Sequence, residues 1–213
     1  MIRAVISDFG GVLTSPLIES FLAYQDDSGI SFEDLGHAMA RAAESSGGDH
    51  PLFELERGRI TEAEFLGAIE AELGGDVKLE SMRETYFANL RPNEPMIAYM
   101  RDLRDRGLRM ALLTNNVREW EPHWRAKIPQ IDQIFEVIVD SGFVGMRKPD
   151  PAIYELTVER LGDGLAAKEC VFVDDIDVNC DAAAALGMHP VQFHNAEQAI
   201  TEVEELLREV GTA

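Results

Sequence analysis

The chain has 213 residues, of which 46% are hydrophobic and 27% charged, a composition typical of soluble globular domains. This composition excludes a disordered chain, a collagen-like repeat and a coiled coil. Acidic residues outnumber basic ones by 39 to 19, and the formal net charge is −20. Such a surface repels nucleic-acid phosphates and anionic lipid, so we expect neither a nucleic acid nor a membrane as a partner.

The sequence shows no sign of secretion or of a membrane span. The first residues, MIRAVISDFGG, lack the long apolar core of a secretory signal. No apolar stretch approaches the ~18 residues that a membrane span requires. The two cysteines, Cys170 and Cys180, are too few for a disulfide framework. We therefore expect a reduced, cytoplasmic protein.

Short runs that are apolar throughout recur along the chain, and they predict strands. Such runs suit strands that are buried on both faces of a parallel sheet. They occupy residues 4–6, 110–113, 137–139, 171–173 and 190–193. Helical patterns over residues 95–106 and 151–161 alternate with these runs, each with Pro near its start and Gly just past its end. The alternation predicts an α/β fold, a doubly wound parallel sheet with a Rossmann-like core.

Between the first and second predicted strands the sequence shows helical periodicity and no strand. Residues 61–73 begin with Thr61 and Glu64 at the spacing of a capping box, and residues 31–44 and 79–90 are also periodic. We expect residues 15–90 to form a helical cap domain inserted into a core of residues 1–14 and 91–213. A set of apolar side chains in this segment is expected to pack as the core of the cap itself, although some could instead contact substrate where the cap faces the active site: Phe21, Leu22, Phe32, Leu35, Met39, Phe53, Leu55 and Phe65.

Polar residues stand at the ends of the predicted strands, where open α/β sheets bind their ligands. They are Asp8, Thr114, Asn115, Lys148, Asp174 and Asp175. Each alone has an ordinary explanation as a helix cap or a surface residue. Carboxylates that converge at one sheet edge repel one another, and a divalent cation such as Mg²⁺ relieves that repulsion. A carboxylate can also act as a nucleophile toward phosphorus, with a Lys and a Thr hydroxyl stabilising the transferred group.

Four segments resemble, in order, the four motifs of the haloacid dehalogenase superfamily of hydrolases. They are residues 5–13, 112–116, 145–151 and 171–175, the last followed by Asn179. The predicted helical insertion falls where this superfamily often carries a cap. Within the superfamily, Asp8-Phe9-Gly10-Gly11 and Thr114-Asn115-Asn116 look closest to the phosphatase-like proteins related to the N-terminal domain of soluble epoxide hydrolase.

The resemblance implies Mg²⁺-dependent hydrolysis of a small phosphate monoester, a phosphorylated metabolite, through an aspartyl-phosphate. By that resemblance Asp8 is the nucleophile, Lys148 bridges it and the phosphoryl group, and Thr114 and Asn115 bind the phosphoryl group. The implied metal ligands are Asp8, the backbone carbonyl of Gly10, Asp175 and, more peripherally, Asp174. Asn179 would orient the carboxylates of the metal site. A homodimer is left open.

The chain departs from the superfamily at Gly10. The phosphatases of the superfamily usually carry there a second Asp, which serves as general acid and base, and such help is typically worth about 10²–10⁴ in rate. Asp177, His123 or a carboxylate of the cap are candidate substitutes, and the sequence selects none of them. Two alternatives therefore stay open: a weakly active or inactive binding protein that keeps the fold, and a metal-independent hydrolase of the dehalogenase type.

Overall fold

The computed structural model describes residues 1–46, 50–74 and 77–209 of the chain. Their strands form a five-stranded parallel sheet in the order β3-β2-β1-β4-β5. The strands are β1 (Ala4–Ser7), β2 (Arg109–Thr114), β3 (Val137–Asp140), β4 (Cys170–Asp174) and β5 (His189–Gln192). All five predicted strands are present, and the predicted α/β class with a parallel sheet is confirmed.

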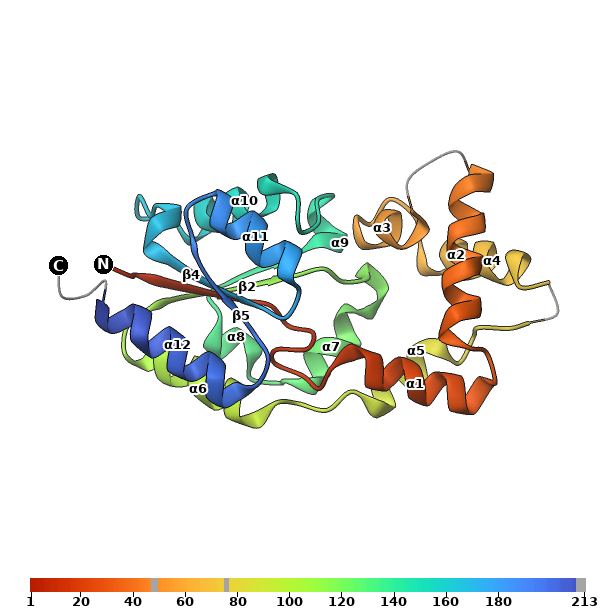
Figure 1. Cartoon of the computed structure of the whole chain (residues 1–213), viewed down its shortest axis with the longest axis horizontal. Helices are drawn as coiled ribbons and strands as arrows, with labels where there is room; N and C mark the ends of the chain where they lie inside the picture. Colours follow the sequence, from red (N-terminus) through yellow and green to blue (C-terminus); the bar gives the residue numbers. More distant parts are fainter. Residues whose placement is uncertain (47–49, 75–76, 210–213) are drawn as a thin grey trace.

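The sheet lies between two layers of helices because its strands are apolar on both faces (Figure 1). Along β1, the Val5 side chain joins one hydrophobic cluster, whereas Ala4 and Ile6 join the other. The first cluster packs under α6 (Glu94–Asp105), α8 (Ile131–Ile134) and α12 (Ala196–Glu209), and the second under α10 (Pro151–Leu161) and α11 (Asp177–Ala185). Continuous apolar runs are therefore what this sandwich requires of its strands.

Local signals in the sequence place the ends of several helices. The Asp150 side chain accepts a hydrogen bond from the Ala152 backbone N–H at 3.0 Å, which caps α10 at its predicted start. Thr61 and Glu64 form the predicted capping box at the start of α4 (Glu62–Glu72). The remaining short helical segments of the core are α7 (Glu121–Lys127), α9 (Ser141–Val144), η1 (Arg118–Trp120) and η2 (Ala167–Glu169).

The chain between β1 and α6 forms a helical insert at one end of the sheet (Figure 1). Besides α4, its helices are α1 (Leu17–Ser28), α2 (Phe32–Ser46), α3 (Pro51–Glu56) and α5 (Met82–Asn89). The two connections to the core run side by side, because Thr14 and Pro92 form an antiparallel bridge and the Asn93 N–H donates to the Leu13 carbonyl at 2.8 Å. The insert thus enters and leaves the core at one place, beside the end of β1.

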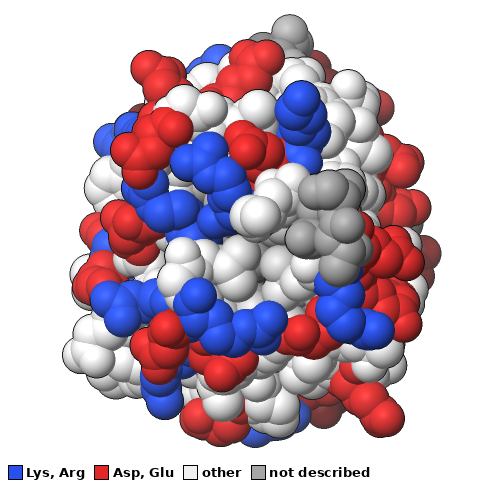
Figure 2. All heavy atoms as spheres, turned by 90° about the vertical axis from the view of Figure 1, so that its left-hand side faces the viewer, with Lys and Arg blue, Asp and Glu red and all other residues white. Residues whose placement is uncertain are grey.

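The end of the molecule that faces away from the insert carries both signs of charge (Figure 2). Lys and Arg side chains there are interspersed with Asp and Glu rather than gathered in one basic patch. At the same end of the sheet, Arg3 pairs with Glu169 and Arg109 with Glu136. Cys170 and Cys180 are both buried and free. No helix among the described residues is long and apolar enough to cross a membrane.

Candidate active site

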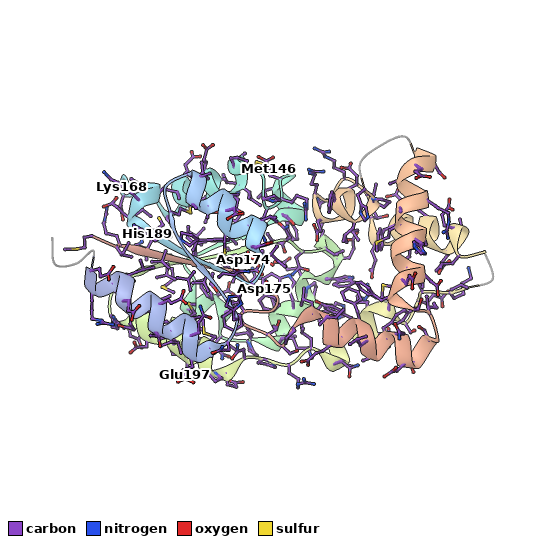
Figure 3. All side chains as sticks on the ribbon, in the orientation of Figure 1. Met146, Lys168, Asp174, Asp175, His189 and Glu197 are labelled. Carbon is purple, nitrogen blue, oxygen red and sulfur yellow. The ribbon has the colours of Figure 1, made fainter. Side chains whose placement is uncertain are left out.

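Three of the predicted polar residues meet where neighbouring strands end. Asp8 directly follows β1, Thr114 ends β2 and Asp174 ends β4. Because β1 lies between β2 and β4 in a parallel sheet, these carboxyl ends share one edge. The edge faces the helical insert, as the labelled side chains of Asp174 and Asp175 show (Figure 3). The topology therefore brings residues more than a hundred positions apart into one site.

The centre of the site is a buried lysine between two carboxylates. The Lys148 Nζ lies 2.7 Å from Asp8 Oδ1 and 2.6 Å from Asp174 Oδ2, and its side chain is 2% exposed. Burial alone lowers the pKa of Lys148, but Asp174 and Asp8 together raise that pKa above its usual value. Lys148 therefore stays protonated and neutralises part of the negative charge at the sheet edge.

Asn115 holds the loop that carries Lys148. Its side-chain oxygen accepts from the Lys148 backbone N–H at 2.8 Å, and its side-chain nitrogen donates to the Lys148 carbonyl at 3.0 Å. Both ends of the amide are thus engaged, so this side chain fixes the lysine in place. Thr114 is buried beside it, and both residues line the cavity in front of Asp8.

Asn179 fixes the carboxylate of Asp174. Its Nδ2 lies 3.0 Å from Asp174 Oδ1 and 3.2 Å from Asp174 Oδ2. Its backbone carbonyl accepts from the Tyr154 hydroxyl at 3.0 Å. Ser7 donates to the Asp8 carbonyl at 2.8 Å. Neither Tyr154 nor Ser7 had a role assigned from the sequence, although Ser7 is a polar residue at the end of an otherwise apolar strand.

Asp8, Asp174 and Asp175 form a cluster that could hold a metal ion. One oxygen from each lies within 4.8 Å of the others. Burial, and then the charges of Asp174 and Asp175, raise the pKa of Asp8 to about 7 even though Lys148 lowers it. Burial and the charge of Asp174 likewise raise the pKa of Asp175 to about 6. Lys148 therefore does not fully neutralise the negative charge of the three carboxylates, and their oxygens are the ligands that Mg²⁺ prefers.

The two glycines after Asp8 are in contact with neighbouring side chains. Gly11 has a φ of +79°, and a Cβ atom built on it would lie 2.3 Å from Asp175 Oδ2, so only glycine fits. A Cβ atom on Gly10 would lie 3.0 Å from Leu17 Cδ1, at the start of α1. Leu17 therefore fills the space into which a side chain at position 10 would extend.

The candidate substitutes for an acid at position 10 lie in different places. Asp177 and His123 are exposed and are absent from the lining of the cavity in front of Asp8, so far as the structure describes it. His123 stacks on Phe87 with ring centroids 5.2 Å apart. Two carboxylates of the insert, Glu56 and Glu62, do line the cavity. Glu56 is bound to Arg147 at 2.6 Å, and burial raises the pKa of Glu56 despite that partner.

A cavity of about 910 Å³ separates Asp8 from the helices of the insert. Of the apolar side chains that we expected to form the core of the cap, only Leu22 does not line it; the others are Phe21, Phe32, Leu35, Met39, Phe53, Leu55 and Phe65. Leu35, Leu55 and Phe65 are also buried in a hydrophobic cluster of the insert, as expected. The expectation was incomplete for the others, because helical periodicity cannot distinguish a side chain that faces another helix from one that faces a cavity.

A comparison with known families places this site in context. Residues 2–187 match the model of the haloacid dehalogenase-like hydrolases. The chain belongs to this family. It is 27% identical to a sesquiterpene phosphatase of Aspergillus oryzae over 96% of both chains. It is also 25% identical, over 96% of its length, to bifunctional epoxide hydrolase 2 of Mus musculus. The expected relationship to the soluble epoxide hydrolases is thus confirmed.

Some curated relatives are much longer proteins. The chain spans 39% of the mouse epoxide hydrolase and 19% of another mouse relative. Among solved structures, a family member from Bacteroides thetaiotaomicron, in complex with magnesium and inorganic phosphate, superposes with a TM-score of 0.66. It is 25% identical, and the match covers 90% of this chain and 94% of the other.

The packing of Leu17 against Gly10 leads to a testable prediction. We expect Gly10→Asp to reduce the free energy of unfolding by ~1–3 kcal/mol, because it overpacks this contact. When Leu17 is already replaced by Ala, Gly10→Asp should cause little further loss of stability. Urea denaturation of the wild type, both single variants and the double variant measures the coupling between the two positions. Additive effects of the two substitutions would contradict the contact.

Proposed function

We propose that the protein is a Mg²⁺-dependent phosphatase that hydrolyses phosphate monoesters through a phosphoryl group carried on Asp8. The observation that carries this proposal is the position of Lys148, within 2.7 Å of Asp8 and 2.6 Å of Asp174. An ammonium group there neutralises the nucleophilic carboxylate and lies where it can also bind an incoming phosphoryl oxygen. The family membership, and the magnesium and phosphate bound by the Bacteroides relative, support the same chemistry.

The proposed reaction has two steps. In the first, a carboxylate oxygen of Asp8 attacks phosphorus, the bond from phosphorus to the ester oxygen breaks, and the alcohol leaves after taking a proton from solvent. In the second, water attacks the phosphorus of the aspartyl-phosphate, and the bond to Asp8 breaks. Inorganic phosphate is released, the proton of the water passes to solvent, and Asp8 is restored. Thr114 and Asn115 border the space in which the phosphoryl group is transferred.

The donor atoms of this site fit Mg²⁺. The three clustered carboxylates supply oxygen ligands, and the Gly10 carbonyl is the proposed backbone ligand. When bound, Mg²⁺ supplies positive charge that stabilises the charge on the transferring phosphoryl group. Asn179 positions this group of ligands through its two contacts with Asp174.

We further propose that residues 15–90 act as a cap domain that opens and closes over a core of residues 1–14 and 91–213. The paired connections at Thr14 and Pro92 support this division, because both lie at one point beside the site. The ion pair between Arg147 and Glu56 joins the cap to the core beside Lys148. Closure shields the site from bulk water, and opening admits substrate.

The proposal predicts turnover of an activated aryl phosphate that requires both Asp8 and Mg²⁺. Asp8→Asn should lower kcat by about 10³-fold or more, because the nucleophile is lost. A chelator should abolish the activity of the wild type reversibly. Asp105→Asn, at an exposed acid on α6 that is outside the described cavity lining, is the matched control and should retain wild-type kcat.

Two results would overturn this function. Activity that survives the chelator would indicate a metal-independent hydrolase of the dehalogenase type. No turnover by folded protein that binds Mg²⁺ would indicate a binding protein. Gly10 makes the second outcome a serious alternative, since the chain has no carboxyl group at that position.

The pKa values predict how Mg²⁺ binding depends on pH. Asp8, with a pKa raised to about 7, is mostly protonated at pH 6 and mostly ionised at pH 8. Because Mg²⁺ must displace that proton, and part of one on Asp175, its affinity should be about 10- to 20-fold higher at pH 8 than at pH 6. Isothermal titration calorimetry measures this ratio. Asp8→Asn should lose most of the pH dependence, and equal wild-type affinities at the two pH values would contradict a ligand role for Asp8.

A further inference from the structure

The cavity in front of Asp8 is larger and more apolar than a small polar metabolite needs. Its volume of about 910 Å³ is near the upper end of the ~300–1,000 Å³ usual for ligand sites. Besides the residues named above, the insert lines it with Leu17, Ile18, Leu52, Leu66, Ile69, Met82 and Leu90. The core adds the rings of Phe9, Trp120 and Trp124. Apolar surface facing an open cavity is costly in water, so a hydrocarbon that covers it binds favourably.

The described part of the insert offers few polar groups to a substrate. Its charged or hydroxyl-bearing side chains on the cavity are Glu56, Glu62 and Tyr86. Glu56 is bound to Arg147, whose guanidinium carbon lies 4.0 Å from the centre of the Phe53 ring.

The other two polar groups of the insert are Glu62 and Tyr86. Glu62 accepts hydrogen bonds from the Trp120 Nε1 and the Arg83 Nη1, each at 2.7 Å. Tyr86 contributes one hydroxyl group. A sugar or nucleotide would bury many more polar atoms than these groups can satisfy, and each unsatisfied one is costly.

The apolar lining of the cavity extends to the place where Asp8 would attack phosphorus. Leu17 packs where a side chain on Gly10 would extend, two residues from Asp8. The first carbons of the leaving alcohol would therefore meet an aliphatic side chain beside the phosphate site. The charged side chains at the sheet edge are Asp8, Lys148 and Asp175, whereas the carboxylates of the insert are already paired, Glu56 with Arg147 and Glu62 with Arg83. The cavity thus has the polarity of an amphiphile, with a charged head and a hydrocarbon tail.

We propose that the physiological substrate is the phosphate monoester of a hydrocarbon alcohol, whose chain fills the cavity between α1, α2, α4 and α5. The inference rests on the proposed phosphatase function and assigns its substrate class. It places specificity in the helical insert, while the sheet edge performs the reaction. Binding energy from the hydrocarbon holds the ester against Asp8, where the core supplies no side chain at Gly10 to orient the leaving group.

The test compares alkyl phosphates of increasing length. Butyl, hexyl, octyl and decyl phosphate share one leaving-group chemistry, and each is used below its critical micelle concentration. We expect kcat/KM to rise by about fourfold for each methylene buried, until the chain fills the cavity. Glucose 6-phosphate should be a poorer substrate than hexyl phosphate. An aryl phosphate run alongside reports whether the enzyme is active at all.

Two exposed phenylalanines provide a test substitution and its matched control. Phe32 is 48% exposed and lines the cavity, whereas Phe143 is 50% exposed and does not line it. Phe32→Ser should lower kcat/KM for decyl phosphate by about five- to tenfold and leave butyl phosphate within about twofold. Phe143→Ser should leave both substrates within about twofold of the wild type. Both sites are at the surface, so circular dichroism should show that the fold is retained.

The possible results separate this inference from the function on which it rests. If the aryl phosphate is hydrolysed but kcat/KM does not rise with alkyl length, the phosphatase function stands and the hydrocarbon substrate is wrong. An equal effect of Phe32→Ser on short and long esters would also overturn it. If neither the aryl nor any alkyl phosphate is hydrolysed, the phosphatase function itself fails, and the substrate class falls with it.

Discussion

The Lys148 ammonium group is the constraint on which the sheet edge depends. It binds two buried carboxylates from different strands, and the side chain of Asn115 fixes the backbone on either side of it. Without that cation, Asp8 and Asp174 would be two buried like charges with no partner. Removing one partner of a buried ion pair typically costs ~3–5 kcal/mol of stability. The lysine does not satisfy the whole cluster, because the pKa values of Asp8 and Asp175 remain raised. The protein thus keeps an excess of negative charge at the place where a divalent cation would stabilise it.

Most of the core was predictable from local patterns. The central positions of the strands are apolar because both faces are covered, and the Pro and Gly signals around residues 151–161 correspond to the ends of α10. The convergence of Asp8, Thr114 and Asp174 was predictable because parallel strands bring their carboxyl ends to one edge. The amide contacts of Asn115 were not, since nothing in its surroundings in the sequence distinguishes an amide that binds phosphate from one that binds a loop. The cavity was not predictable either, because it depends on how far the insert stands from the sheet.

A glycine at position 10 has two consequences for the candidate site. Gly10 removes a side chain that could transfer protons, and Leu17 of the insert fills the adjoining space with an aliphatic group. The lack of a proton-transferring side chain at this position and the apolar surface beside it are therefore found at one contact. The core and the insert contribute different parts of the cavity: charged residues lie at the strand ends, and the helices between β1 and β2 provide most of its apolar surface. On the proposed function, this division would let a strongly acidic protein hold an anionic ester, since Lys148 and a bound cation would act locally and the tail would add attraction that does not depend on charge.

The central claim is that Asp8 carries the phosphoryl group, and trapping that group tests it most directly. The enzyme would be mixed with Mg²⁺ and an activated aryl phosphate, quenched in acid during turnover, digested and analysed by mass spectrometry. Because no acid–base side chain stands at Gly10 to assist water, the second step should be slow enough for the aspartyl-phosphate to accumulate. We predict a phosphoryl group that fragmentation assigns to Asp8 and that is absent from Asp8→Asn. A phosphoryl group on another residue, or phosphate release with no covalent phosphoryl enzyme at any quench time, would contradict the account.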